Sequence, residues 1–280
     1  MERYARHSVR DRAASGNRRL ANRDMKILFD LDYTLLDTVK FKEALVKAVS
    51  SCGPSPEKYD AAYAETVAKK GLFDPDDLFA ALSAEFPDED AAREARARFG
   101  RVLGSTEAFL YPGAKELLET LRKHDATVDL MTFGNADWQR KKVEHSGLAG
   151  LFDEVIATEK EKKGIVREAG RGEDKVIIVN DNGQEMKDMM AEAPEYTYVL
   201  KKGPKAVPSD LRLPTAETID DLAVILERET GWELRREMDE ASRERKEGRV
   251  VREGEDARGE IDMRDETGGE PSAPFAGVRR

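Results

Sequence analysis

Residues 25–35 of the chain read Met-Lys-Ile-Leu-Phe-Asp-Leu-Asp-Tyr-Thr-Leu. Residues 27–29 are a short, continuous apolar run, which is typical of a strand buried on both faces of a parallel sheet. Two acids, Asp30 and Asp32, follow this run closely. Open parallel sheets place their functional residues just beyond the carboxyl ends of the strands. We therefore expect both acids to lie at the functional edge of a sheet.

The second half of the chain repeats this pattern. Short apolar runs alternate with segments of helical periodicity, and the run at residues 176–179 is the most strand-like of all. The predicted helices are 112–123, 136–145, 161–169, 184–191 and 219–228, and the predicted strands are 127–131, 154–157, 176–179 and 196–200. Strands that alternate with helices imply a parallel sheet covered on both faces. The predicted fold class is therefore α/β, a Rossmann-like doubly wound parallel sheet.

The segment between the first strand and this alternation has a different character. Over residues 39–109 apolar residues recur at helical spacing, and no strand pattern occurs. Glycine and proline breaks divide the segment, at Gly53-Pro54, Gly71, Asp74-Pro75 and Pro87. We therefore predict an all-helical domain of residues 38–110, inserted into a core domain of residues 25–37 and 111–230.

The two ends of the chain lack such periodicity. Residues 1–24 are polar and rich in Arg, and residues 231–280 carry many charges of both signs. Both are predicted to be disordered, because neither offers enough apolar surface for a packed core. For the start of the second segment an extension of the last helix through pairs of opposite charge is the alternative.

Composition excludes several kinds of protein. The chain has 57 acidic and 47 basic residues and a net charge of −10, which argues against nucleic acid or an anionic membrane as its main partner. Cys52 is the only cysteine, so neither an intramolecular disulfide nor a thiolate metal cluster can form within the chain. No apolar run approaches the roughly 20 residues that a membrane span needs. We expect a cytoplasmic protein; the sequence is silent on its oligomeric state.

Acidic and polar residues follow three of the predicted strands. They are Asp30 and Asp32 after the first strand, Thr132-Phe133-Gly134-Asn135 after the strand at 127–131, and Asn180-Asp181 with Glu185 after the strand at 176–179. A single Asp at a strand end is more often a cap or turn residue, but the ordered set is specific. Carboxylates held close together raise each other's pKa values unless a cation compensates them, and Mg²⁺ fits a site of few carboxylates. The sequence therefore predicts a Mg²⁺ site at this edge.

This order of motifs resembles the haloacid dehalogenase superfamily over residues 25–229. The first motif is met by residues 29–35, the second by Thr132, and the fourth by Asp181 with Glu185. The resemblance requires a lysine before the fourth motif, and we favour Lys160 over the alternatives Lys162 and Lys163. It also implies that residues 38–110 form a mobile cap over the site. The fourth motif departs from the commoner pattern, since it begins with Asn180 and has Glu185 where an aspartate is usual.

The resemblance implies a Mg²⁺-dependent phosphatase that acts on a small phosphorylated metabolite. Asp30 would attack phosphorus and form an aspartyl-phosphate, and Asp32 would protonate the leaving group and then activate water. Mg²⁺ would be held by Asp30, Asp181 and the backbone carbonyl of Asp32, with Glu185 nearby. Asp32 favours the phosphatase branch, because a halide leaving group needs no acid.

The resemblance also implies roles for the remaining candidates. Thr132 and the lysine would donate to the phosphoryl oxygens. Thr34, Gly134 and Asn135 are candidates for substrate binding, although Thr34 suits orientation of the nucleophile loop better and Asn135 is equally suited to a turn. Two alternatives stay open: phosphoryl transfer, as in a sugar-phosphate mutase, and a non-catalytic member that binds a phosphorylated ligand.

Overall fold

The computed structural model describes residues 25–124 and 126–244. The chain divides into two units, residues 1–235 and 236–280, and the fold and the site below belong to the first. The predicted disorder of residues 1–24 and 245–280 lies outside the described residues. The prediction for the start of the tail is wrong in part, because residues 234–244 are helical. They form a separate helix, since Gly231 adopts a left-handed conformation with φ of 78° and ends the preceding one.

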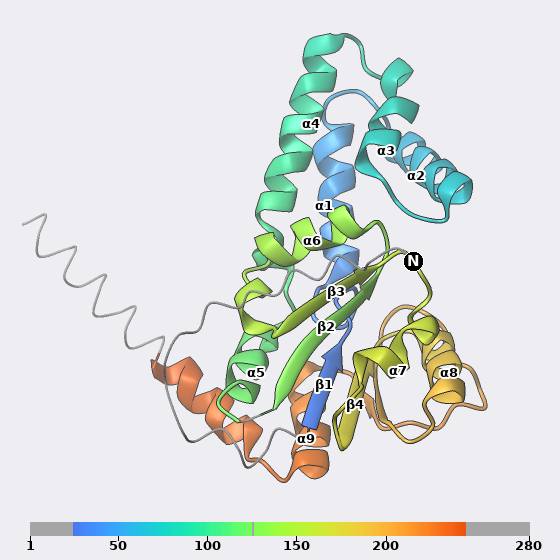
Figure 1. The fold of residues 1–280 in the computed structure, drawn as a ribbon. Coiled ribbons are helices and arrows are strands. Elements are labelled where there is room, and N and C mark those ends of the chain that lie inside the picture. Colours follow the sequence, from blue (N-terminus) through green and yellow to red (C-terminus); the bar gives the residue numbers. More distant parts are fainter. Residues whose placement is uncertain (1–24, 125, 245–280) are drawn as a thin grey trace, which may run out of the picture. The chain divides into compact units, whose positions relative to one another are not determined.

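Six parallel strands form one sheet in the order β3-β2-β1-β4-β5-β6 (Figure 1). Their bounds are β1 Met25–Phe29, β2 Thr127–Phe133, β3 Glu154–Thr158, β4 Lys175–Asn180, β5 Thr197–Lys201 and β6 Thr215–Ala216. The α/β prediction is confirmed, with β6 as a short addition at one edge. Strand order reverses between β1 and β4, and such a switch point is where doubly wound sheets bind ligands.

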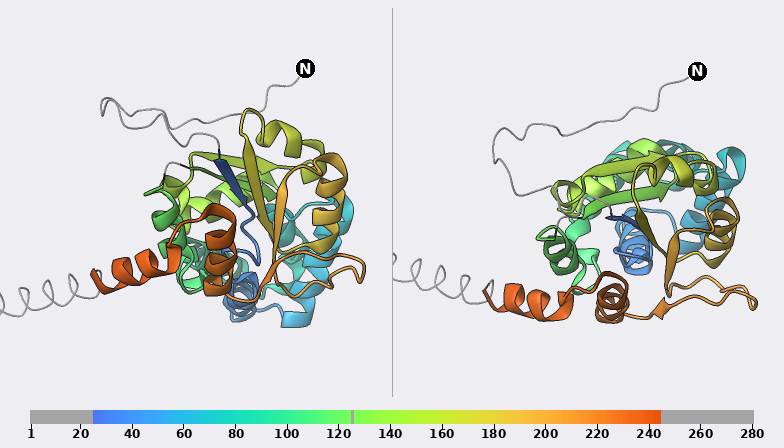
Figure 2. Two further views of the ribbon diagram at one scale, coloured as in Figure 1. Left: turned by 90° about the horizontal axis from the view of Figure 1, so that it is seen from below. Right: turned by 60° about the horizontal axis from the view of Figure 1, so that its bottom comes forward.

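Helices cover both faces of this sheet. On one face, α7 (Val166–Ala169) and α8 (Gly183–Glu192) pack on apolar side chains of the strands, among them Leu28 and Ile178. On the other lie α5 (Ala114–Leu121) and α9 (Ile219–Thr230), which pack against each other (Figures 1 and 2). The strands are therefore buried from both sides, which is why residues 27–29 are continuously apolar.

The helix predicted at 161–169 is broken. A 3₁₀ turn occupies Lys162–Gly164, and α7 starts only at Val166, because Ile165 between them has φ of −124°, outside the helical range. Helix α6 spans Ala136–His145, between β2 and β3 in the chain, and packs against both strands. Its N-terminus directly follows the carboxyl end of β2.

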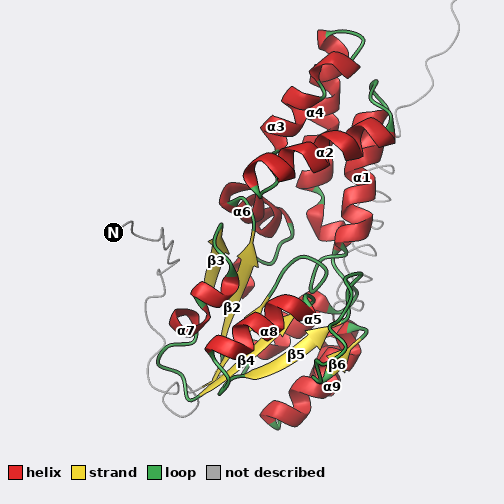
Figure 3. Ribbon diagram, turned by 90° about the vertical axis from the view of Figure 1, so that its right-hand side faces the viewer, coloured by secondary structure: helices red, strands yellow, loops and turns green. Residues whose placement is uncertain are grey.

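Residues 38–109 contain helices and no strand, as predicted. The helices are α1 Thr38–Ser50, α2 Pro56–Lys70, α3 Pro75–Ala81 and α4 Glu89–Gly104, with 3₁₀ turns at Ser83–Glu85 and Thr106–Phe109. The predicted breaks act as helix ends. Gly71 closes α2 in a left-handed conformation, and the Asp74 side chain caps α3 just before Pro75. Figures 1 and 3 show these helices beyond the ends of the strands, away from α8 and α9.

Two paired segments join this helical insertion to the sheet. Asp37 N donates to Phe109 O at 2.8 Å, and Tyr111 N donates to Leu35 O at 2.9 Å. The entry and exit of the insertion therefore form a short antiparallel pairing directly after the β1 loop.

In the described part of the chain no helix has the length and apolar character needed to cross a membrane.

Candidate active site

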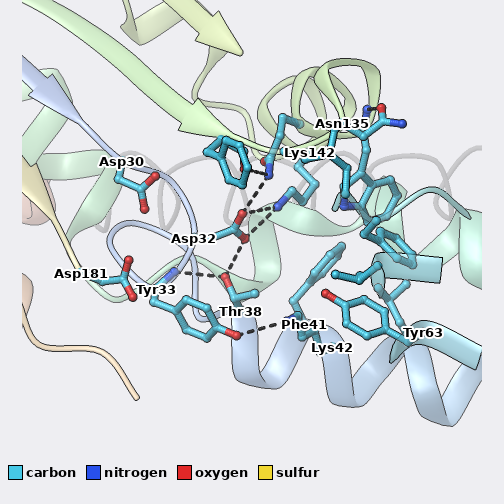
Figure 4. Close-up of a pocket in the computed structure, with 18 of the residues that line it drawn as sticks. Asp30, Asp32, Tyr33, Thr38, Phe41, Lys42, Tyr63, Asn135, Lys142 and Asp181 are labelled. Carbon is cyan, nitrogen blue, oxygen red and sulfur yellow. Dashed lines mark hydrogen bonds and ion pairs between the residues drawn. The ribbon is translucent and has the colours of Figure 1, made fainter. Parts of the chain in front are cut away.

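A cavity of about 480 Å³ lies at the carboxyl ends of β1, β2 and β4. Its lining residues come from both parts of the molecule. The core supplies the acids, which follow β1 and β4, and lysines from α6, from the 3₁₀ turn after β3 and from the segment after β5. The insertion supplies mostly apolar side chains, from α1 and α2 among others. Figure 4 shows the labelled residues of this cavity. The predicted acids Asp30, Asp32, Asp181 and Glu185 all line it. The predicted convergence of the four carboxylates is therefore confirmed.

A tight turn after β1 presents the first two acids. Asp30 N still donates to Val179 O of β4 at 2.9 Å, so Asp30 continues the strand ladder. The amides of Leu35 and Leu36 both donate to Leu31 O, which closes the turn. Tyr33 takes a φ of 62°, a conformation unusual for a residue other than glycine and often found at functional sites. The turn is thus held in one shape by the backbone itself.

Lys162 is the lysine that contacts Asp30. Its Nζ donates to Asp30 Oδ1 at 2.6 Å and lies 3.1 Å from Glu185 Oε2. The side chain is 3% exposed, and its two acidic neighbours raise the pKa of Lys162 despite the opposing effect of burial. Lys160, the residue favoured from the sequence, is exposed and does not line the cavity. That choice is corrected, because the 3₁₀ turn at Lys162–Gly164 directs the Lys162 side chain inward.

Asp181 carries the least satisfied charge of the cluster. The residue is buried, and its Oδ2 has no hydrogen-bond partner. Burial, together with the neighbouring Asp30, raises the pKa of Asp181 to about 7. Burial also raises the pKa of Asp30, although Lys162 opposes this. Glu185 differs: Lys162 and the Asn180 amide outweigh burial and lower its pKa. Asp30 and Asp181 are therefore adjacent buried acids whose negative charges are not fully balanced by nearby positive charges.

These residues fit a divalent cation held by few protein ligands. Among the described residues no group of three or more His, Cys, Asp or Glu side chains is arranged to enclose a metal ion. Mg²⁺ needs no such cage, because one or two carboxylates with water and a substrate oxygen suffice. The unpartnered Asp181 Oδ2 beside the buried Asp30 is the polar atom such an ion would satisfy. Glu185 is already bonded to Asn180, Asn182 and Lys162, so its role would be indirect.

Asp32 sits in a polar pocket that the sequence analysis did not foresee. Lys142 Nζ donates to both of its oxygens, Gln139 Nε2 donates at 3.2 Å, and Thr38 Oγ1 donates at 2.8 Å. Burial alone would raise the pKa of Asp32, but these partners, Lys142 above all, hold it at about 2. The spacing of Gln139 and Lys142 on the predicted helix 136–145 was the available signal, because residues three apart share a helix face.

The other predicted residues lie close by in different roles. Thr34 Oγ1 donates to Asp30 Oδ2 at 3.3 Å and does not line the cavity, so it contacts Asp30 and not the cavity space. Thr132 lies within β2, and its buried hydroxyl has no partner and is not part of the lining. Gly134 and Asn135 do line the cavity. The Asn135 side chain caps α6 and also donates to Asp74 Oδ2 of the insertion at 3.2 Å.

Comparison with known proteins agrees with this picture. A family model described as haloacid dehalogenase-like hydrolase matches residues 27–191, more than half of the chain. No curated protein matches the sequence. Among solved structures, a haloacid dehalogenase-like family hydrolase from Xanthomonas campestris is 15% identical with a TM-score of 0.54, over 82% of this chain and 100% of that one.

Two further structures have similar TM-scores. A 2-haloacid dehalogenase from Pseudomonas syringae is 24% identical with a TM-score of 0.52, over 73% of this chain and 98% of that one. YfnB from Bacillus subtilis, bound to magnesium, is 19% identical with a TM-score of 0.52, over 73% of this chain and 99% of that one. At such identities the likeness establishes the fold and leaves the substrate open.

Proposed function

Because this chain belongs to the haloacid dehalogenase-like hydrolases, we propose that it is a Mg²⁺-dependent phosphatase with Asp30 as nucleophile. One observation carries the proposal: the unpartnered, buried Asp181 Oδ2 at the end of β4, next to the buried Asp30 at the end of β1. A site for attack on a phosphate ester needs a cation, because carboxylate and phosphate repel each other. Mg²⁺ bound by Asp30, Asp181 and the Asp32 carbonyl would supply that neutralisation.

In the first step an Asp30 carboxylate oxygen attacks phosphorus. A bond from Asp30 to phosphorus forms, the bond from phosphorus to the ester oxygen breaks, and that oxygen takes up a proton. Thr34 holds one Asp30 oxygen and Lys162 the other, which orients the carboxylate. Asp32 is the acid in this proposal. Since Lys142 donates to both oxygens of the ionised Asp32, the proton leaves the Lys142 ammonium group and reaches the ester oxygen through Asp32.

In the second step water attacks the aspartyl-phosphate. The same pair accepts the proton that water loses. Because water attacks phosphorus, the bond from phosphorus to Asp30 breaks and inorganic phosphate leaves. Asp30 is thereby regenerated with both of its own oxygens. Lys162 is the cation that donates to the phosphoryl oxygens, and Thr132 is a candidate second donor because its hydroxyl is unpartnered. The insertion lines the cavity opposite these groups and would exclude bulk water from part of it.

One observation favours a second candidate, displacement of halide from a halogenated organic acid. Asp32 is held as an ion pair by Lys142 in the structure, and a departing halide requires no proton from it. The nucleophile would still be Asp30, which would form an ester with the carbon that loses the halide. This reaction needs no divalent cation, so it leaves the unpartnered Asp181 oxygen without a role.

The test is an assay of phosphate release and halide release by the purified full chain, with and without Mg²⁺. We expect phosphate release from phosphate monoesters that requires Mg²⁺ and is abolished by Asp30→Asn. Asp220→Asn, the same change at an exposed position of α9, is the control and should keep full activity. Halide release without Mg²⁺ would replace the phosphatase proposal with the second candidate. Transfer of phosphate between positions of a sugar without release would indicate a mutase.

A further inference from the structure

The cavity has two chemically different ends. One end holds the carboxylates and lysines of the proposed reaction. The other is lined by aromatic side chains that we call the aromatic wall: Phe41, Tyr59, Tyr63, Phe73 and Trp138. In Figure 4, Asp30 and Asp181 lie on one side of Asp32, and Phe41 and Tyr63 lie on the other. If the phosphorus atom of a ligand lies at Asp30, the rest of that ligand therefore extends toward the aromatic wall.

The rings of the wall support one another. Tyr63 and Phe73 stack with ring centroids 4.9 Å apart, and Phe73 meets Trp138 edge-on at 5.4 Å. The ring centroids of Trp138 and Phe41 are 6.2 Å apart. Since these rings already hold each other in position, the surface is preformed and a ligand need not order it on binding.

Helix α6 connects this wall to the reacting groups. Trp138 and Lys142 are four residues apart on it, so they share one face of the helix. Trp138 contacts the rings of the insertion, and Lys142 contacts Asp32. The apolar surface therefore begins about one helical turn from the proposed proton donor, which is the reach of a single ring attached next to a phosphate.

The insertion side of the cavity is more apolar than the side formed by the strand ends. Apart from the tyrosine hydroxyls, the insertion supplies the side chains of Thr38, Lys42 and Asp60. Thr38 Oγ1 is engaged by Asp32, and Lys42 Nζ donates to Tyr33 Oη at 3.2 Å. A sugar would lose the water on several hydroxyl groups here and find few replacements, which costs binding energy.

We propose that the phosphate ester cleaved at Asp30 carries a flat aromatic group, bound against the aromatic wall, in place of a sugar or other polyol. The inference rests on the proposed function for the chemistry at Asp30, and on the wall alone for the preference. An aromatic ring gains apolar contact with Tyr63, Phe73 and Trp138, and it brings no polar atom of its own that needs a hydrogen-bond partner there.

Binding tests the preference without any turnover. Titration calorimetry of the full chain with Mg²⁺ would compare benzylphosphonate with 2,3-dihydroxypropylphosphonate, which share the anionic head and differ in the attached group. We expect benzylphosphonate to bind about tenfold to a hundredfold more tightly. Equal affinities, tighter binding of the dihydroxypropyl compound, or no binding of either would overturn the proposal.

Variants locate the preference on the wall. Tyr63→Leu and Phe73→Leu should each reduce the ratio of the two affinities several-fold, since either removes a ring but keeps an apolar side chain. Phe86→Leu is the matched control. Phe86 stacks on Phe79 elsewhere in the insertion and does not line the cavity, so the ratio should not change. A ratio insensitive to both wall variants would also contradict the proposal.

Turnover separates this inference from the proposed function. Benzyl phosphate and glycerol phosphate are esters of alcohols with comparable leaving ability, so their kcat/KM values compare binding of the attached group. A higher kcat/KM for benzyl phosphate supports both proposals. Equal values refute the aromatic preference and leave the phosphatase intact. Selective binding of benzylphosphonate without hydrolysis of either ester refutes the phosphatase and supports the aromatic wall as a binding surface.

Discussion

Lys142 Nζ lies 2.7 and 2.6 Å from the two carboxylate oxygens of Asp32, so a buried lysine of α6 holds the second acid of the β1 loop. The two residues are far apart in sequence and belong to different elements. Their contact links the loop that carries the proposed nucleophile to the helix that carries Trp138 of the aromatic wall. Lys162 makes the corresponding contact with Asp30, the first acid of the loop, at 2.6 Å.

The Asp32–Lys142 pair makes stability depend on pH. Its partners hold the pKa of Asp32 at about 2, below the value of about 4 expected in the unfolded chain. A depressed pKa stabilises the fold above the unfolded value, and this stability is lost as pH falls from about 4 through 2. Between pH 5 and pH 2, urea unfolding should show the wild type losing about 2 kcal/mol more than Asp32→Asn. Parallel curves for the two proteins would contradict the ion pair; Asp220→Asn, which changes an exposed acid, should parallel the wild type.

Two neighbouring lysines should differ sharply in importance. Lys162→Met removes the cation that contacts Asp30 and Glu185, and we expect kcat/KM to fall by about 10²–10³. The loss also leaves buried acids without their partner, so thermal stability should drop. Lys160→Met changes an exposed side chain outside the cavity and should leave kcat/KM close to that of the wild type. The reverse order of the two effects would restore the assignment favoured from the sequence alone.

Mg²⁺ should stabilise the folded protein through Asp181. At about 100 times its Kd, Mg²⁺ is expected to raise the melting temperature by about 5–10 °C. The shift should be larger at pH 8 than at pH 6, because a cation binds the ionised acid and the pKa of Asp181 is raised to about 7. Asp181→Asn should lose most of the shift, whereas Asp188→Asn, on α8 outside the cavity, should keep it. A Mg²⁺ effect of equal size in both variants would place the ion elsewhere.

Gly134 should tolerate no side chain. Its φ is 146°, and a Cβ atom there would lie 2.7 Å from Gln139 Nε2, which donates to Asp32. We expect Gly134→Ala to cost about 1–3 kcal/mol in urea unfolding and to lower kcat/KM, since Gln139 must move. Gly231→Ala is the control, because Gly231 has φ of 78° with open space around it and lies outside the cavity. Its cost should be strain alone, with kcat/KM unchanged.

The architecture followed from local patterns in the sequence. Apolar runs such as residues 27–29 and 176–179 are continuous because their strands are covered on both faces, and the breaks at Gly71 and Pro75 are helix ends for stereochemical reasons. Once the strands are parallel and adjacent, Asp30 and Asp181 must meet at one edge. The single helix predicted at 161–169 was wrong, because the pattern of apolar residues does not reveal the break at Ile165.

The partners of the acids were decided by tertiary structure. Lys160, Lys162 and Lys163 are chemically alike, and only the path of the 3₁₀ turn determines that Lys162 points to Asp30. The contact of Lys142 with Asp32 and the aromatic lining of the cavity were not predicted from the sequence for the same reason. A helical period marks which residues share a face, but it does not say what that face meets. The contact of Phe73 with Trp138 exists because the insertion folds back over α6, and interactions between residues so distant in sequence arise only from packing.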